Sequence, residues 1–140
     1  RAQKYIICLP KVTGETMEFF VTESEQDLSE GSFHIMEPKN GCRKADETRS
    51  EILRTAPILV PGMGFVETGA RLGKGGGFYD RYLEQHAGHM TIALAYEFQI
   101  LGEIPVGPYD KNVDLIVTEK RVIRCKDRDV GTRIREEQPC

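Results

Sequence analysis

The sequence predicts an α/β fold with a mostly parallel sheet in its core. Three short apolar segments, residues 57–61, 91–96 and 113–117, have the composition of buried strands. Residues 79–86 lie between the first two of these segments, and their apolar and aromatic side chains recur at helical spacing. Strands that alternate with helices favour parallel pairing, because a crossover helix returns the chain to the same end of the sheet.

Local composition also predicts the elements at the start and the end of the C-terminal half, residues 57–140. Residues 57–61 are apolar between two prolines, which predicts a central strand buried on both faces. Residues 119–125 predict a terminal strand. Residues 126–140 are highly charged, so we expect a flexible tail after a single α/β domain of residues 1–125.

The N-terminal half is expected to be less regular. Residues 4–9 predict a strand that Pro10 ends, and residues 17–22 predict a second strand after a turn near Gly14. Residues 23–54 are polar and predict mainly loop, with one helical turn at residues 24–28. Because the chain begins almost inside a strand, we expect that a preceding segment is absent from this sequence.

Composition excludes several classes of function. With 140 residues, 39% of them hydrophobic and 29% charged, the chain has the size and composition of one folded domain. A net charge of -3 gives no field to attract nucleic acid or an anionic membrane. No apolar run approaches the ~20 residues of a membrane span, and no signal peptide opens the chain, so we expect a cytoplasmic protein.

The strongest functional signal lies in residues 61–80. This segment has seven glycines, the cations Arg71 and Lys74, and a predicted helix that begins near Phe78. Glycines let backbone N–H groups surround phosphate oxygens, and a helix N-terminus and nearby cations add positive charge. The pattern is neither a P-loop nor a dinucleotide fingerprint. The residues by themselves therefore predict a phosphate-binding α/β domain.

Asp80 supports two interpretations. It falls in the first turn of the predicted helix, where the helix dipole favours a carboxylate without any function. It also follows a phosphate-binding loop, where a carboxylate suits the Mg²⁺ ion that bridges nucleotide phosphates. Spacing does not decide between them.

The motifs around this loop resemble one enzyme family. The runs PGMGF at residues 61–65, GxRLGxGxGFYD at residues 69–80 and RYL at residues 81–83 closely resemble the signature of the 5-formyltetrahydrofolate cyclo-ligases, also called methenyltetrahydrofolate synthetases. Further similarity lies at residues 4–11, at the Glu37-Pro38 pair and at residues 104–114. The resemblance covers residues 4–117.

This resemblance implies a three-layer α/β/α fold with a mostly parallel central sheet, related to the CoA transferase-like fold. It also implies an ATP-dependent ligase. In that reaction ATP activates the formyl oxygen of 5-formyltetrahydrofolate, and the N10 amine attacks the phosphorylated intermediate. The products are 5,10-methenyltetrahydrofolate, ADP and phosphate. Such chemistry needs positioning and charge neutralisation more than a protein nucleophile.

The resemblance further implies roles for individual residues. ATP, the co-substrate, would be bound by Arg71, Leu72, Gly73, Lys74, Gly75, Gly76, Gly77, Phe78 and Tyr79, with Arg71 and Lys74 as the catalytic cations. The folate would be bound by Lys74, Gly75, Gly76, Gly77, Phe78, Met17 and Glu37. Mg²⁺ would be held by Asp80 and Asp110, with Asp114 as a weaker candidate. We expect a monomer whose partners are small molecules, with no nucleic acid and no membrane.

Structural roles compete with several of these assignments. Tyr79 and Phe78 also suit packing of the helix onto the sheet, Asp110 suits a turn, and Met17 and Glu37 suit core or surface positions. The family's basic N-terminal helix has no counterpart before residue 4, and Phe78 stands where the family usually has tyrosine. A non-catalytic nucleotide- or folate-binding homologue with a regulatory role is the alternative function.

Overall fold

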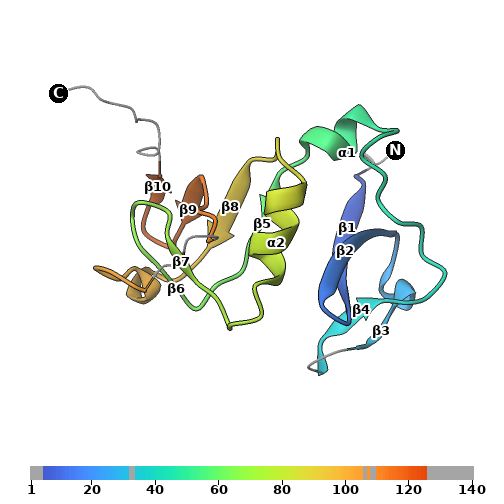
Figure 1. Ribbon diagram of the computed structural model, residues 1–140, viewed down its shortest axis with the longest axis horizontal. Helices are drawn as coiled ribbons and strands as arrows, with labels where there is room; N and C mark the ends of the chain where they lie inside the picture. The colour runs from blue at the N-terminus through green and yellow to red at the C-terminus, as the bar shows by residue number, and fades with distance from the viewer. Residues whose placement is uncertain (1–4, 32–33, 106, 108–109, 126–140) are drawn as a thin grey trace. The chain divides into compact units, whose positions relative to one another are not determined.

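The computed structural model describes residues 5–31, 34–105, 107 and 110–125. The chain forms two compact units, Arg1–Arg54 and Thr55–Cys140, and each is described by itself (Figure 1). The expectation of a single domain over residues 1–125 stays a prediction. The predicted tail, residues 126–140, lies outside the described residues.

An antiparallel hairpin organises the N-terminal unit. Strands β1 (Ile7–Thr13) and β2 (Thr16–Thr22) pair along their whole length, with Thr13 opposite Thr16 at the turn. Gly14 makes this turn at a φ of 65°, in the left-handed region that glycine enters without strain. The two predicted strands and the turn between them are confirmed.

β1 passes through Pro10, and the expectation that Pro10 ends the strand is wrong. Two residues further on, the Val12 N–H donates to Glu37 Oε2 (3.2 Å) and so faces away from β2. In a strand the polar groups of residues i and i+2 face the same side, so the Pro10 nitrogen also faces away from β2. Proline is tolerated at such positions because the ladder loses no hydrogen bond.

Residues 23–54 are more regular than the sequence predicted. Ser24 caps a 3-10 turn at Glu25–Asp27, which confirms the predicted helical turn. Strands β3 (Leu28–Glu30) and β4 (Met36–Pro38) then form a short antiparallel pair, and helix α1 covers Glu51–Thr55. These three elements were missed because they have only three to five residues, too few to show a strand or helix pattern.

The second unit contains a four-stranded sheet in the order β10-β9-β8-β5 (Figure 1). Strands β5 (Ile58–Leu59), β8 (Thr91–Leu94) and β9 (Leu115–Val117) run parallel, and β10 (Val122–Arg124) joins antiparallel to β9. Helix α2 (Phe78–Gln85) lies between β5 and β8 in the chain. The predicted α/β class, the mostly parallel sheet and the terminal strand are confirmed.

The two faces of this sheet differ in burial. Side chains on one face are buried, and they are Ile58, Val60, Thr91, Ala93, Ile116 and Ile123. On the other face Leu59, Leu94 and Val122 are 59%, 62% and 56% exposed among the described residues. The expectation of a central strand buried on both faces at residues 57–61 is therefore wrong for β5, which is an edge strand of the described sheet. An apolar run by itself does not reveal a strand's place in the sheet.

Asp114 joins the amino-terminal ends of β8 and β9. Its Oδ2 accepts hydrogen bonds from the Thr91 backbone N–H (2.9 Å) and hydroxyl (3.2 Å). Ligands of open α/β sheets bind at the carboxyl ends of the strands, so Asp114 lies at the opposite end. This structural role competes with the weaker metal role that the family resemblance implies for Asp114.

Candidate phosphate-binding site

The glycine-rich loop lies between a small hairpin and helix α2. Strands β6 (Gly64–Phe65) and β7 (Arg71–Leu72) pair antiparallel, and residues 73–77 lead from β7 into the helix. Gly75 and Gly77 have φ values of 102° and 70°, so both positions require the left-handed backbone that glycine adopts most readily. The predicted loop and the helix start at Phe78 are confirmed.

The N-terminus of α2 is open to an acceptor. Its N-cap residue is Gly77, which provides no side-chain hydrogen bond to the first turn. Helix N-termini leave backbone N–H groups without helical partners and carry a partial positive charge. An anion such as phosphate satisfies both.

Lys74 is the exposed cation of the loop. Within the described part of the chain its ammonium group makes no ion pair, whereas Lys44 and Lys111 each contact a glutamate. A Cβ atom added at the neighbouring Gly75 would meet nothing within 4 Å, so the loop is also sterically open here. The position of Lys74 suits contact with a ligand that approaches from solvent.

Arg71 lies in a different environment. Its side chain is 7% exposed, its Nη1 donates to the Pro61 carbonyl (2.9 Å) and its Nη2 donates to Asp80 Oδ1 (3.0 Å). The Asp80 side chain is 19% exposed. This pair links the end of the β5 segment to the first turn of α2.

Asp80 also contacts the segment that contains Asp110. Its Oδ1 accepts the backbone N–H of Lys111 (3.0 Å), the residue after Asp110, while Oδ2 makes no hydrogen bond to any described residue. Asp110 itself is exposed, and its Oδ2 accepts the Gly107 N–H (2.7 Å). The structure thus brings the backbone next to Asp110 against the Asp80 side chain, across thirty residues of sequence.

The two aromatic residues of the loop motif make internal contacts. The Phe78 ring lies against Gly76, where an added Cβ would come within 2.7 Å of it, and the Arg81 guanidinium carbon lies 5.1 Å from the ring centroid. Burial raises the pKa of the Tyr79 phenol, and the nearby charge of Arg71 opposes this rise. The phenol is therefore neutral at physiological pH.

Met17 and Glu37 belong to the interior of the N-terminal unit. Met17 in β2 is 6% exposed, and Glu37 in β4 is 7% exposed and accepts the Val12 N–H. A Cβ atom at Gly31 would lie 2.1 Å from a Glu37 carboxylate oxygen, so the carboxylate packs directly on the backbone. The sequence left both core and surface positions open for Met17 and Glu37, and both side chains lie in the core.

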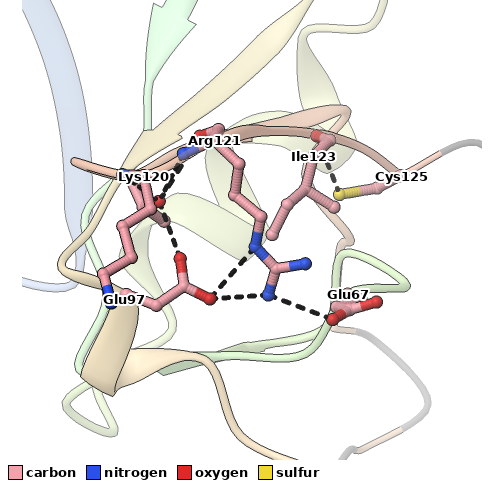
Figure 2. A network of polar contacts seen from close by, with 7 residues as sticks. Glu67, Glu97, Lys120, Arg121, Ile123 and Cys125 are labelled. Atoms are coloured by element: carbon pink, nitrogen blue, oxygen red, sulfur yellow. Dashed lines mark hydrogen bonds and ion pairs between the residues drawn. The ribbon is translucent and has the colours of Figure 1, made fainter.

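A surface network that the sequence did not indicate lies at the carboxyl ends of β8 and β9. The Glu97 carboxylate accepts hydrogen bonds from Arg121 Nη2 (2.6 Å) and the Thr118 hydroxyl (2.8 Å), and Arg121 also reaches Glu67 (3.1 Å) (Figure 2). Hydrogen bonds from Arg121 and Thr118 hold the pKa of Glu97 below its usual value. The network joins the β6–β7 turn to the turns that follow β8 and β9.

The mostly parallel sheet places this unit in the α/β class, and the open glycine loop beside an uncapped helix N-terminus is a candidate site for an anion. Among the described residues there is no group of three or more histidine, cysteine, aspartate or glutamate side chains placed to hold a metal. No helix in the described part of the chain is long and apolar enough to cross a membrane.

Comparison with known proteins identifies the family. A model of the 5-formyltetrahydrofolate cyclo-ligase family matches residues 1–119, and the chain belongs to this family. It is 38% identical over 109 residues to the 5-formyltetrahydrofolate cyclo-ligase of Mus musculus, covering 71% of this chain and 51% of the mouse protein. It is 33% identical over 112 residues to a mitochondrial cyclo-ligase of Arabidopsis thaliana, covering 70% of this chain and 40% of that protein.

Solved structures agree with this assignment. The NMR structure of Aquifex aeolicus 5,10-methenyltetrahydrofolate synthetase matches with a TM-score of 0.70 and 36% identity, covering 87% of this chain and 59% of that one. The resemblance inferred from residues 61–83 is thereby confirmed. The chain spans about half the length of the mouse relative, 51%.

Proposed function

We propose that this chain takes part in the ATP-dependent conversion of 5-formyltetrahydrofolate to 5,10-methenyltetrahydrofolate, with release of ADP and phosphate. Membership of the cyclo-ligase family supports the reaction class. The observation that carries the proposal is the open loop of residues 73–77, which presents an exposed Lys74 beside the uncapped N-terminus of α2. We infer that this loop binds the phosphates of ATP.

In this proposal the residues of the loop supply charge and position. Backbone N–H groups of residues 73–77 and of the first turn of α2 donate to phosphate oxygens, and the Lys74 ammonium neutralises the charge that develops on the transferred group. The Phe78 ring and the glycines beside it form the part of the loop that borders the folate. Contact of Met17 and Glu37 with the folate, a cytoplasmic location and a monomeric state stay predictions.

The carboxylates near the loop fit Mg²⁺. Asp80 Oδ2 and Asp110 Oδ1 are oxygens without hydrogen-bond partners among the described residues, and Mg²⁺ prefers one or two carboxylates with phosphate oxygens and water. Two carboxylates form an incomplete site, so we expect tight metal binding only together with ATP. The ion would neutralise charge on the phosphates when bound.

Turnover tests the proposed function. The chain is mixed with 5-formyltetrahydrofolate and Mg-ATP, and the absorbance of the methenyl product is recorded together with ADP release. We expect the two products to form in equal amounts, because one ATP activates one formyl group. ADP formation without methenyl product would contradict the reaction. Binding of ATP without any turnover would support the alternative of a non-catalytic nucleotide-binding homologue.

A further inference from the structure

We propose that Arg71 is a positioning residue, which holds Asp80 and the glycine loop in place and does not itself contact the phosphates. The proposal rests on the function proposed above, since it divides the two loop cations between two roles. Lys74 is the cation that meets the ligand. Arg71 acts through Asp80.

The contacts of Arg71 join three segments of the second unit. Nη1 reaches the Pro61 carbonyl beyond β5, and Nη2 reaches Asp80 in the first turn of α2. Asp80 Oδ1 in turn accepts the N–H of Lys111. One guanidinium group therefore orients the Asp80 carboxylate, which in turn binds the Lys111 backbone. The planar fork of arginine suits its two acceptors, the Pro61 carbonyl and Asp80.

Burial separates Arg71 from solvent ligands. Its side chain is 7% exposed, and its Nε is buried without a hydrogen-bond partner among the described residues. The guanidinium group of Arg71 thus donates to internal acceptors at Pro61 and Asp80, whereas Lys74 is exposed to solvent. Moving Arg71 toward a phosphate would break its hydrogen bonds to the Pro61 carbonyl and to the partly buried Asp80 carboxylate, which is unfavourable.

Two glycines of the motif make room for Arg71. A Cβ atom at Gly73 would lie 2.9 Å from Arg71 Nη1, and one at Gly62 would lie 2.7 Å from Phe65 Cζ and 3.0 Å from Arg71 Cγ. Neither Gly62 nor Gly73 has a positive φ, so their backbone conformation is open to alanine. Gly73 thus leaves space for the Arg71 guanidinium and Gly62 leaves space for both Phe65 and Arg71, whereas Gly75 and Gly77 are required by the path of the loop.

Amide hydrogen exchange of Lys111 tests this role without ATP. In the Arg71→Lys and Arg71→Met variants, Asp80 loses the bond that orients it, so exchange at the Lys111 amide should rise by about tenfold, the factor for one hydrogen bond of ordinary strength. The matched variant Lys74→Met should leave this exchange unchanged. Unchanged Lys111 exchange in both Arg71 variants would overturn the proposal.

ATP affinity in a double-mutant cycle gives a second, independent measurement. Gly73→Ala should weaken ATP binding in the wild-type chain, because the new methyl group displaces Arg71. The same substitution should have less than a twofold effect in the Arg71→Met background, where the clash is absent. Additive losses would show that Gly73 and Arg71 act separately and would overturn the proposal.

The outcomes also separate this proposal from the proposed function. If the wild-type chain binds no ATP while Lys111 exchange responds to Arg71, the positioning contact stands and the proposed function falls. If Arg71→Met weakens ATP binding as strongly as Lys74→Met and leaves Lys111 protected, Arg71 is a direct phosphate ligand. That result would refute the positioning role and support the proposed function.

Discussion

At the scale of single residues, Lys74 and Arg71 show how environment separates two cations of one motif. The sequence gives both the same charge three residues apart. In the structure Arg71 donates hydrogen bonds to the Pro61 carbonyl and the Asp80 carboxylate. Lys74 is exposed and makes no ion pair among the described residues. Loss of Lys74 should therefore affect ligand binding and leave folding unchanged.

We predict that Lys74→Met weakens ATP binding by about tenfold or more, since a hydrogen bond from a charged donor is typically worth ~1.5–3 kcal/mol. The melting temperature should stay within experimental error, because the side chain is exposed and makes no ion pair among the described residues. Calorimetric titration with ATP and thermal unfolding measure the two effects. Lys120→Met, which removes an exposed cation outside the loop, is the matched control. Equal effects of the two substitutions on ATP affinity would place the phosphates elsewhere.

At the scale of elements, the Glu97 network gives the β6–β7 turn and the ends of β8 and β9 a common anchor (Figure 2). The pKa of Glu97 is lowered by Arg121 and Thr118, so the folded state holds the ionised carboxylate more strongly than the unfolded state does. Its stabilisation is therefore present above the ordinary carboxyl pKa of 4.5 and is lost as the pH falls through the lower folded-state value.

We predict that Glu97→Gln lowers the melting temperature at pH 7 and that this difference from the wild type disappears under acid conditions. The substitution keeps the shape of the side chain and removes its charge. Because the network lies at the surface, the difference should also shrink in high salt. Thermal unfolding of both proteins over a pH series provides the measurement. A difference that persists unchanged below the folded-state pKa would show that packing, and not charge, is responsible.

The elements also show what local sequence can and cannot predict. β2 and α2 were predictable because their residues match strand and helix patterns over seven and eight positions. β3 and β4 were not, because each has only three residues and depends on pairing with the other. Pro10 in β1 and the exposed edge position of β5 depend on which neighbour each strand has, and this is decided by tertiary structure.

The candidate site divides in the same way. The loop was predictable, because residues 71–80 combine glycines, two cations and a helix start in one recognisable sequence pattern. The Pro61 carbonyl and the Lys111 amide are backbone groups that any residue type provides, and no sequence pattern marks them. Likewise, only the folded chain shows that Asp114 binds Thr91 while Asp80 contacts the segment beside Asp110.

At the scale of the whole molecule, the family assignment covers most of the chain while the chain covers 51% of its mouse relative. One face of the sheet in the second unit carries the exposed side chains of Leu59, Leu94 and Val122. Parallel sheets in α/β proteins are normally covered on both faces. The described loop nevertheless has its own left-handed glycines and its own uncapped helix, so its capacity to bind phosphate can be tested in this chain.

The central claim is that the glycine-rich loop binds the phosphates of ATP, and NMR of the ¹⁵N-labelled chain during titration with Mg-ATP tests it most directly. We predict that the amide signals that shift most belong to Gly73, Gly75, Gly76 and Gly77 and to the first turn of α2, and that Lys74→Met reduces their response at a given ATP concentration. Shifts confined to the N-terminal unit, or a loop whose signals do not respond to saturating Mg-ATP, would contradict the claim.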